Sequence, residues 1–475
     1  MRNYLYIISI LISFIYFYFN SDFNLNKENL YFPLTLVFFS LLFFVTKKDE
    51  IFLLSKNSFK HSNIFILGFI IVSFQVTIDF ILGNVTSYNQ FLFVNNSIVV
   101  KSTWLSVAAL NSFFLGYSVK NNIKRFNFNS KIKSQKQNSI FILLSFIATI
   151  ILYFSTVNPL YLAGYYGSEN MGETATYAAL MIKLFGYSYL IFKTRSLYFS
   201  NNINSLKDYI LKMGYIFNLF LLIYLLSVMF SGDRGPLMTF PLAYLSGYFI
   251  LTKKKLSYTK GFILVLAGAF FITTLGVVRS MNKDLSLIDR FSTSLEEDSY
   301  KKNSISPHTF ELASSIKTIH HAVDYVPEKH DFLYGRFQFQ QLFFTIPFAS
   351  NFRELIYDDI SYKYKGSASF ITWVFQGDNP TYGNGTSAIT DFYLDFGFFG
   401  VVFGLFFFGS AIRLAEQVMY NTIIPPLFLH VFVVCYMASA LYIARSSVLF
   451  EFRNVVWIFL ILKVDEVLFK LKQSV

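Results

Sequence analysis

Long apolar stretches recur along the whole of this chain. A helix needs about 20 apolar residues to cross a bilayer core about 30 Å thick, and only helices or closed barrels can satisfy their backbone groups there. The sequence therefore predicts an all-α polytopic membrane protein with about twelve transmembrane helices. They are expected at 3–19, 31–46, 63–83, 98–119, 139–157, 174–192, 209–230, 236–252, 259–277, 389–412, 423–442 and 452–469.

The composition agrees with this class. Only 14% of the residues are charged and 54% are hydrophobic, which leaves too few charges for the surface of a soluble protein. The first stretch carries Arg2, and no small-residue cleavage site precedes Asn20, so we expect a retained helix and not a removed signal peptide. The stretch 174–192 carries Lys183 in its middle and could instead lie along the interface or re-enter the membrane.

Lysines and arginines occupy alternate connections between these stretches. The connections after the second, fourth, sixth and eighth stretches are rich in them, whereas 20–30, 84–97 and 158–173 contain only Lys27. The positive-inside rule places the basic connections and both termini in the cytoplasm. It places the long segment 278–388 in the periplasm, between the transmembrane parts 1–277 and 389–475.

Several kinds of site are not expected. The net charge of +12 lies mostly in loops beside apolar stretches, so it indicates topology and not a nucleic-acid surface. The single Cys435 lies in an apolar stretch and excludes a disulfide or a cysteine-based metal site within the chain. Asp358 and Asp359 are adjacent, so their side chains diverge, and Lys363 and Lys365 follow them. A solvated loop is favoured there over a metal site, and we expect no metal and no cofactor.

Arginine is distributed differently from lysine. A guanidinium group binds phosphate oxygens through two parallel hydrogen bonds, so arginines at a membrane face suit a lipid pyrophosphate. The alternatives are snorkelling and pairing with acids such as Glu451 and Asp233. Function is favoured for Arg234, Arg279 and Arg445, since each ends a stretch near headgroup depth, where an unpaired charge is costly. The arginines in expected outer segments, or at outer ends of stretches, are Arg234, Arg279, Arg290, Arg336, Arg353, Arg445 and Arg453.

A tight turn joins the stretches 209–230 and 236–252. It reads Ser231-Gly232-Asp233-Arg234-Gly235-Pro236. The two glycines permit a sharp reversal, and a proline suits the first turn of the next helix. The turn therefore holds Arg234 beside a helix N-terminus, whose free amides also favour an anion.

A glycine-rich segment, 383–388, leads into the stretch 389–412. Asp391 and Asp395 follow it four residues apart, so their carboxylates share one face of the helix. They could favour the helix N-terminus or pair with arginines. Alternatively, Asp391 is a general base.

The segment 278–388 is expected to contain amphipathic helices, one of which runs from Ser306-Pro307 to before Pro327. An apolar stripe runs along it, with His320 at its edge and His321 opposite. His320 is a second candidate base and is better placed than His321, although a loop histidine is usually ordinary surface. The stripe consists of Leu312, Ile316, Ile319, Val323 and Val326.

These residues resemble the O-antigen polymerases of the Wzy type. The resemblance rests on the turn 231–236, the long outer segment, the entry Gly385-Thr-Ser to Gly400, and Arg445. These motifs follow in order over about 230–450, and the topology agrees over the whole chain. One motif departs from the family: members often have Ile-Pro-Arg where this chain has Thr345-Ile-Pro-Phe. A phosphate role in that region would pass to Arg353.

The resemblance implies glycosyl transfer at the periplasmic face of a bacterial inner membrane, on a scaffold similar to GT-C glycosyltransferases. Donor and acceptor would both be oligosaccharides linked to undecaprenyl pyrophosphate, and a chain-length regulator protein stays open as a further partner. The pyrophosphate would be bound by Arg234, Arg279, Arg353 and Arg445. The catalytic groups would be Asp391, His320 and Arg279.

Two other functions remain open. A flippase or another secondary transporter can have twelve spans, but it typically shows related halves or polar residues at the midplane. An O-antigen ligase shares the topology and the pyrophosphate chemistry, but it uses lipid A core as its acceptor. Only the resemblance separates polymerase from ligase.

Overall fold

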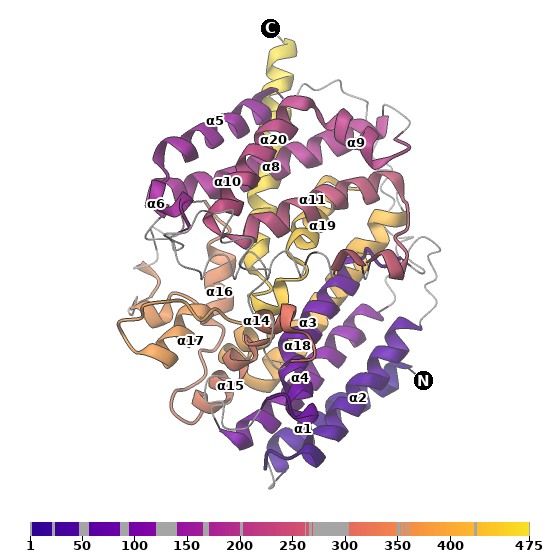
Figure 1. Ribbon diagram of the computed structural model, residues 1–475, viewed down its shortest axis with the longest axis vertical. Coiled ribbons are helices and arrows are strands. Elements are labelled where there is room, and N and C mark those ends of the chain that lie inside the picture. Colours follow the sequence, from indigo (N-terminus) through magenta and orange to yellow (C-terminus); the bar gives the residue numbers. More distant parts are fainter. Residues whose placement is uncertain are drawn as a thin grey trace.

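Figure 1 shows the computed structural model of the protein. The structure describes residues 2–20, 24–46, 57–85, 95–119, 140–164, 171–199, 203–261, 263–265, 268, 304–347, 349, 352, 355–357, 359, 361–421 and 425–474. Helices are the regular elements of these ranges, and no strand occurs among them. The predicted all-α class is confirmed.

The helices before the long segment are mostly long and apolar. Their ends follow local rules: Asn26 caps α2 by accepting a hydrogen bond from the Asn29 amide (2.7 Å), and Gly83 ends α3 in the left-handed conformation. These helices are α1 (Arg2–Phe19), α2 (Lys27–Val45), α3 (His61–Leu82), α4 (Asn96–Tyr117), α5 (Ile140–Thr156), α6 (Pro159–Leu162), α8 (Glu173–Phe199), α9 (Leu206–Met213), α10 (Tyr215–Ser231) and α11 (Arg234–Thr252).

The long segment folds into short helices, and three long elements follow it. Its elements are η3 (Pro307–Thr309), α14 (Phe310–Ala313), α15 (Ile316–Tyr325), α16 (Arg336–Phe343), η5 (Tyr362–Tyr364) and α17 (Ser367–Gln376). Then come α18 (Ala388–Asn421), α19 (Leu427–Ser439), the short η6 (Ile443–Arg445) and α20 (Phe450–Ser474). α18 is broken at Phe396 and Gly397, where the backbone leaves helical geometry.

The expected membrane stretches coincide with helices, apart from 259–277, most of which lies outside the described residues. Five described helices (α2, α3, α4, α8 and α18) are long and apolar enough to cross a membrane. α9 and α10 form a pair bent by 97°, and α1, α5 and α19 are apolar but shorter. The structure thus supports a polytopic membrane protein, while the number of spans stays a prediction.

Helix ends gather on two opposite faces of the molecule. One is the loop face, which we define as residues 304–387 together with the helix ends that they contact. There Asp79, near the end of α3, accepts a hydrogen bond from Ser304 (2.6 Å), and Arg234 at the start of α11 pairs with Glu311 of α14. In Figure 1, α6, α15, α16 and α17 lie on the left.

The other ends of the same helices lie on the opposite face. The amide of Ser58, before α3, donates to the carbonyl of Leu256, after α11 (2.9 Å), and Asn57 donates to the Tyr420 hydroxyl at the end of α18 (3.3 Å). The N-terminus and α9 lie on the right of Figure 1. This alternation is the one that the positive-inside argument requires. Which side of the membrane each face occupies stays a prediction.

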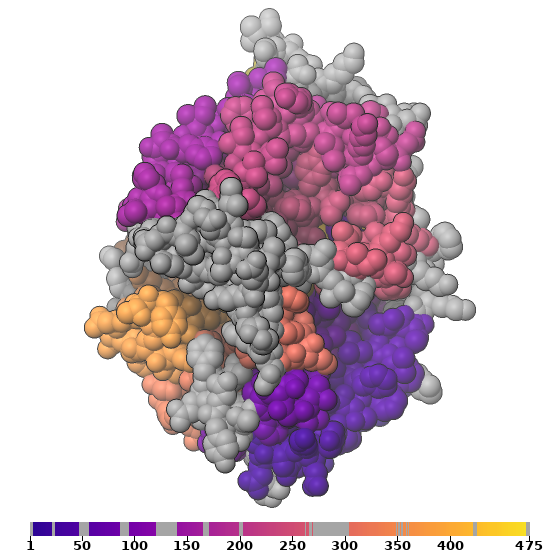
Figure 2. Space-filling model, in the orientation of Figure 1, coloured from indigo at the N-terminus to yellow at the C-terminus, as the bar shows by residue number. Residues whose placement is uncertain are grey.

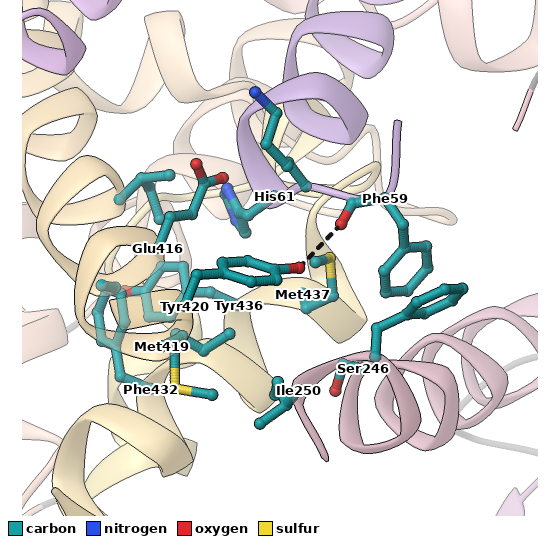
Figure 3. Close-up of a pocket in the computed structure, with 15 residues that line it drawn as sticks. Phe59, His61, Ser246, Ile250, Glu416, Met419, Tyr420, Phe432, Tyr436 and Met437 are labelled. Atoms are coloured by element: carbon teal, nitrogen blue, oxygen red, sulfur yellow. Dashed lines mark hydrogen bonds between the residues drawn. The ribbon is translucent and has the colours of Figure 1, made fainter. Parts of the chain in front are cut away.

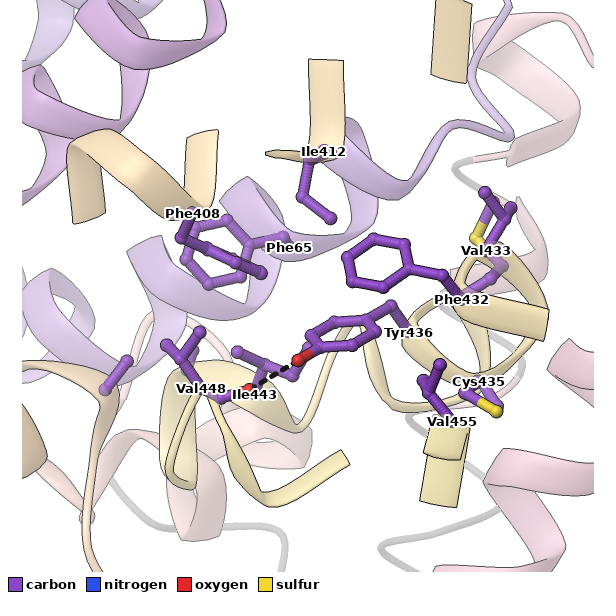
Figure 4. Packing of buried hydrophobic residues seen from close by; sticks show 14 of the residues in the cluster. Phe65, Phe408, Ile412, Phe432, Val433, Cys435, Tyr436, Ile443, Val448 and Val455 are labelled. Atoms are coloured by element: carbon purple, nitrogen blue, oxygen red, sulfur yellow. Dashed lines mark hydrogen bonds between the residues drawn. The ribbon is translucent and has the colours of Figure 1, made fainter. Parts of the chain in front are cut away.

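A continuous apolar core joins the helices, and part of it fixes the position of η6. Figure 4 shows Phe65 of α3, Phe408 of α18 and Tyr436 of α19 packed together beside Ile443, the first residue of η6, and Val448, which follows η6. The Tyr436 hydroxyl donates to the Val448 carbonyl (3.0 Å). The connection that carries Arg445 is therefore held from within the core. At the surface, the segment containing α17 (orange in Figure 2) lies on the opposite side of the view from α1 and α2.

Candidate functional site

The predicted turn between α10 and α11 has the expected geometry. Gly232 ends α10 with φ 76°. Glycine adopts this left-handed conformation without strain because it has no Cβ. The Asp233 carboxylate caps α11 by accepting a hydrogen bond from the Gly235 amide (3.0 Å), and it also accepts one from the Tyr161 hydroxyl (3.4 Å). Arg234 is the first residue of α11. The prediction that it lies at a helix N-terminus is confirmed.

Arg234 already has an acidic partner. Its guanidinium forms an ion pair with the carboxylate of Glu311, on α14 of the long segment. The Arg234 side chain is 11% exposed, whereas that of Glu311 is 52% exposed. The sequence named Asp233 as a possible partner of an arginine and missed Glu311, which is 77 residues away. Since an exposed carboxylate can exchange for another anion, this pair leaves the guanidinium available to a phosphate.

Arg445 lies in the same part of the loop face as Arg234. It is half-buried at the end of η6. The neighbouring Tyr442 is within electrostatic range of Arg445, Arg234, Glu311 and Asp233. The structure therefore brings together two arginines that are predicted to bind pyrophosphate, although they come from segments far apart in the chain.

Lys317 of α15 adds a cation to this region. Its side chain is buried, with the residue 8% exposed, and its Nζ lies 5.2 Å from the centre of the Phe375 ring. Burial and the nearby Arg445 together lower the pKa of Lys317 to about 8. Sequence reasoning missed Lys317 because it treated lysines as topology markers. Its place on the amphipathic helix, beside stripe residue Ile316, was the available signal.

The other predicted arginines are placed differently. Arg279, Arg290 and Arg353 lie outside the described residues, so their assignments stay predictions. Arg336 lies at the start of α16, 4.2 Å from the centre of the Tyr364 ring. Arg453, in α20, is close to Glu451 and lies over the Phe450 ring.

Asp391 is the centre of a buried hydrogen-bond network. It is 0% exposed. Its Oδ1 accepts from Ser367 (2.6 Å), Ser447 (3.0 Å) and Gln341 (3.1 Å), and its Oδ2 accepts from Gln338 (2.9 Å) and Gln341 (3.2 Å). These partners are neutral amides and hydroxyls, and none of them is an arginine of the described ranges. A carboxylate offers about four acceptor positions, and this network occupies all of them.

Asp395 lies one turn further along α18 and faces the same helix of the long segment. Its carboxylate accepts from the backbone amides of Phe337 (3.2 Å) and Gln338 (2.8 Å), in the first turn of α16. The prediction that Asp391 and Asp395 share a face is confirmed. Hydrogen-bond donors of α16 stabilise both carboxylates. The Asp395 carboxylate lies at the N-terminus of α16, where the positive end of the helix dipole stabilises its negative charge.

The predicted amphipathic helix begins at Pro307 but is not continuous. A turn at Ser314 and Ser315 separates α14 from α15. His320 is fully buried, whereas His321 is half-buried with its ring 3.6 Å from that of Phe375. Burial lowers the pKa of His321 to about 4, so the ring is neutral near pH 7. The more accessible of the two histidines is thus the one that the sequence argument ranked second.

A partly buried ion pair explains Lys183 in the stretch 174–192. Lys183 of α8 donates to Glu451 of α20 (2.9 Å), and Asn454 donates to the same carboxylate (2.8 Å). A paired charge is much less costly inside a membrane than an isolated one. The stretch accordingly forms one helix of 27 residues. The sequence offers Glu451 as a partner for an outer arginine; in the structure it forms an ion pair with Lys183 and also lies close to Arg453.

A cavity lies among residues of α3, α11, α18 and α19 and the segment just before α3 (Figure 3). His61 and Glu416 line it, and the Glu416 carboxylate accepts a hydrogen bond from the Ser62 amide (2.9 Å). Most of the remaining lining is apolar. This cavity shares no residue with the predicted site.

Within the described ranges, no group of three or more His, Cys, Asp and Glu side chains is placed to hold a metal. Asp358 lies outside those ranges. Asp359 accepts a hydrogen bond from the amide of Ser361 (2.8 Å) through Oδ1, and its backbone carbonyl accepts one from Arg336.

The fold and the site define a class of helical membrane protein with cationic and acidic side chains gathered at one end of its helices. The family model for the O-antigen polysaccharide polymerase Wzy matches residues 1–470. The chain therefore belongs to the Wzy family of O-antigen polysaccharide polymerases. No curated protein and no solved structure is significantly similar to it.

Proposed function

We propose that this protein joins oligosaccharide repeat units, carried on undecaprenyl pyrophosphate, into O-antigen polysaccharide at the periplasmic face of a bacterial inner membrane. The family supports polymerisation as the broad activity. The observation that carries the finer proposal is the meeting of Arg234 and Arg445 around Tyr442 at the loop face. Both lie at ends of membrane helices or their connections, where the pyrophosphate of a lipid would lie.

The reaction exchanges one bond to the donor sugar for another. The bond between the anomeric carbon of the growing chain and its pyrophosphate oxygen breaks, and the carrier leaves as the pyrophosphate anion. A hydroxyl of the incoming repeat unit forms the new glycosidic bond and gives its proton to a base. Negative charge develops on the leaving oxygen, so guanidinium groups fixed beside it lower the barrier.

Arg234 and Arg445 suit the first task. The amides at the start of α11 add a positive dipole end beside Arg234. On an incoming pyrophosphate, Glu311 is displaced from Arg234, because the phosphate offers two oxygens to the same fork. We assign Arg279 and Arg353 to the same task on the motif resemblance.

Asp391 remains our first candidate for the base, with His320 second. Asp391 must release one of its hydroxyl donors, Ser367 or Ser447, to accept a proton from substrate. The network also gives Asp391 a positioning role, because Ser447 is two residues from Arg445. The two roles make different predictions and are separated in the Discussion.

A deletion strain tests the function. Loss of a polymerase should leave lipid A core bearing a single repeat unit, visible as one band above unsubstituted core on a lipopolysaccharide gel. A plasmid copy of the gene should restore the ladder. Polymer retained on the carrier would indicate a ligase, and absence of repeat units outside the cell would indicate a flippase; either result would refute the proposal.

A further inference from the structure

We propose that α16 and the turn that follows it, residues 336–347, lie inside the membrane leaflet at the loop face, with their apolar side against lipid acyl chains. The segment 278–388 as a whole is predicted to be periplasmic, so this places one part of it at membrane depth. The inference rests on the membrane location of the helices that α16 contacts. It does not depend on the polymerase function proposed above.

α16 turns polar side chains toward the protein and apolar side chains outward. The side-chain amides of Gln338 and Gln341 donate to the buried Asp391 carboxylate (2.9 and 3.1 Å). Phe339 and Leu342 share the outward face and are 52% and 45% exposed. On a soluble protein the apolar face of a surface helix is turned toward the core. The reverse arrangement in α16 is the one expected of a helix whose outer side contacts lipid.

The sequence of this part of the chain lacks charge. No Asp, Glu, Lys or Arg occurs in 337–352, the longest such interval in the segment 278–388. Charged side chains are costly inside a membrane, and those near its surface extend toward the headgroups. Arg336, just before this interval, lies over the Tyr364 ring (4.2 Å) and donates to the Asp359 carbonyl. The first residue of α16 therefore marks its headgroup end.

Both ends of α16 contact helices that are predicted to cross the membrane. Its first amides donate to Asp395, in the predicted stretch 389–412. Beyond its last residue, the Thr345 carbonyl accepts a hydrogen bond from Trp457 (2.8 Å), in the predicted stretch 452–469. Backbone polar groups at membrane depth must find partners in the protein, because lipid offers none. These contacts supply such partners at both ends of α16.

The contact with Trp457 also indicates how deep α16 reaches. Glu451, at the start of α20, forms its ion pair with Lys183, which lies within the predicted membrane stretch 174–192. Trp457 is six residues further along α20, or about 9 Å along the helix axis, in the direction away from η6. The end of α16 therefore lies beside a part of the helix bundle that is predicted to be embedded in the membrane.

The outward face of α16 continues an apolar surface of α18. The Phe396 ring lies against Gly335, the residue before α16, where an added Cβ would be 2.7 Å from the ring. Phe396 is exposed, as are Phe399 and Phe403 further along α18. α18 is long and apolar enough to cross a membrane, so lipid is the expected neighbour of these rings. The same lipid extends to α16 without requiring a second protein copy or another partner there.

The test measures the depth of single spin labels on the full-length protein, with one molecule in each phosphatidylcholine nanodisc. Cys435 is buried and is replaced in a Cys435→Ser background. The labelled variants on α16 are Phe339→Cys and Leu342→Cys. Phe403→Cys on α18 is the lipid reference and Tyr382→Cys, after α17, is the loop reference; both of these native side chains are 58% exposed.

Two relaxing reagents distinguish lipid from water: oxygen concentrates in hydrocarbon, and a nickel chelate stays in water. The two α16 labels should respond mainly to oxygen, like Phe403→Cys, at a depth of about 5–10 Å below the lipid phosphates. Tyr382→Cys should respond mainly to the nickel chelate. If the α16 labels respond to the chelate as Tyr382→Cys does, α16 faces water and the proposal fails. If they respond to neither reagent, protein covers α16 and the proposal also fails.

A second measurement needs no label. Phe339→Asp should lower the melting temperature of the protein in the same nanodiscs, because an ionised side chain in hydrocarbon is costly. Tyr382→Asp is the matched control, an exposed aromatic residue expected in water, and should melt like the wild type. Phe339→Leu should also melt like the wild type, since it stays apolar. An unchanged melting temperature for Phe339→Asp, or an equal loss for Phe339→Leu, would overturn the proposal. Neither measurement uses polymerase activity, so its outcome is separate from that of the deletion strain.

Discussion

Arginine side chains at the loop face differ in what they already bind. Arg234 is paired with the exposed Glu311, whereas Arg445 is within electrostatic range of another cation, Lys317. A lysine in place of either keeps the charge but loses the planar fork that binds two phosphate oxygens. These residues therefore allow geometry and charge to be tested separately.

We expect Arg234→Lys, Arg279→Lys and Arg445→Lys each to abolish or sharply shorten the polymer while the protein level stays normal. Loss of one oriented donor at a developing oxyanion typically lowers the rate about a hundredfold. The measurement is polymer length on gels, with protein amount followed by immunoblot. Arg195→Lys is the control, because Arg195 donates to one carbonyl, that of Pro425, and a lysine can replace that bond. Full-length polymer from all three variants would remove the pyrophosphate role.

Asp391→Asn should abolish polymerisation and leave binding of the lipid-linked repeat unit intact. The structure predicts that this variant folds, because Gln338 and Gln341 each have a buried Oε1 without a hydrogen-bond partner. Those amides can turn and accept from the new Asn amide. His320→Ala should have a milder effect. The assay is polymerisation and binding with purified protein, with a chelator present to test the expectation that no metal is needed.

Ser447→Ala separates the two roles of Asp391. It removes the hydroxyl that links Asp391 to the connection bearing Arg445 but keeps the carboxylate. If Asp391 is the base, this variant retains most of its activity; if Asp391 mainly positions Arg445, it loses pyrophosphate binding. Normal polymerisation by Asp391→Asn together with an inactive His320→Ala would move the base to α15. Inhibition of the wild type by chelator would refute a metal-free mechanism.

At the scale of elements, α3 can approach the connection after α19 because Gly68 has no side chain. A Cβ at Gly68 would lie 2.4 Å from the carbonyl oxygen of Leu441, four residues before Arg445. We expect Gly68→Ala to shift that connection, to lower activity at least about tenfold and to destabilise the protein by about 1–3 kcal/mol. The measurements are a thermal melt in detergent and the polymer ladder.

Gly268→Ala is the matched control for this change. A Cβ at Gly268 would meet no atom within 4 Å among the residues that the structure describes, so its melt and its ladder should be unchanged. Equal behaviour of the two variants would mean that the backbone near Arg445 tolerates displacement, and the positioning argument for η6 would fail.

The sequence predicted those elements whose formation depends on local pattern. The stretch 98–119 corresponds to α4 at Asn96–Tyr117, because a run of apolar residues decides helix formation in a membrane. The turn at Arg234 and the shared face of Asp391 and Asp395 follow from glycine conformation and helical spacing. Such features need no knowledge of distant residues.

Partners that meet only through packing could not be predicted. Lys183 and Glu451 are 268 residues apart, and neither has a neighbour in sequence that reveals the other. The burial of Lys317 depends on how α15 packs against other helices. The break at Ser314 was missed because the apolar stripe continues in phase on both sides of it.

For the whole molecule, the alternation of helix ends between two faces predicts which connections lie on each side of the membrane. We expect a reporter fused after Lys329 to be active only in the periplasm, and one fused after Lys133 only in the cytoplasm. The physical reason is the concentration of lysines in alternate connections. Alkaline phosphatase and green fluorescent protein fusions at both positions provide the measurement. A cytoplasmic signal from the Lys329 fusion would refute both the orientation and the proposed periplasmic reaction.

Hydrogen bonds to two other helices hold the short helix α16 at both ends. Asp395 of α18 holds its first amides, and Trp457 of α20 donates to the carbonyl of Thr345 just after its last turn (2.8 Å). α16 thus connects two membrane helices. Any sliding of α18 against α20 would break one of these hydrogen bonds. If the polymer lengthens at this face, as proposed above, these contacts would hold α16 in place relative to α18 and α20 while the sugar chain moves past it.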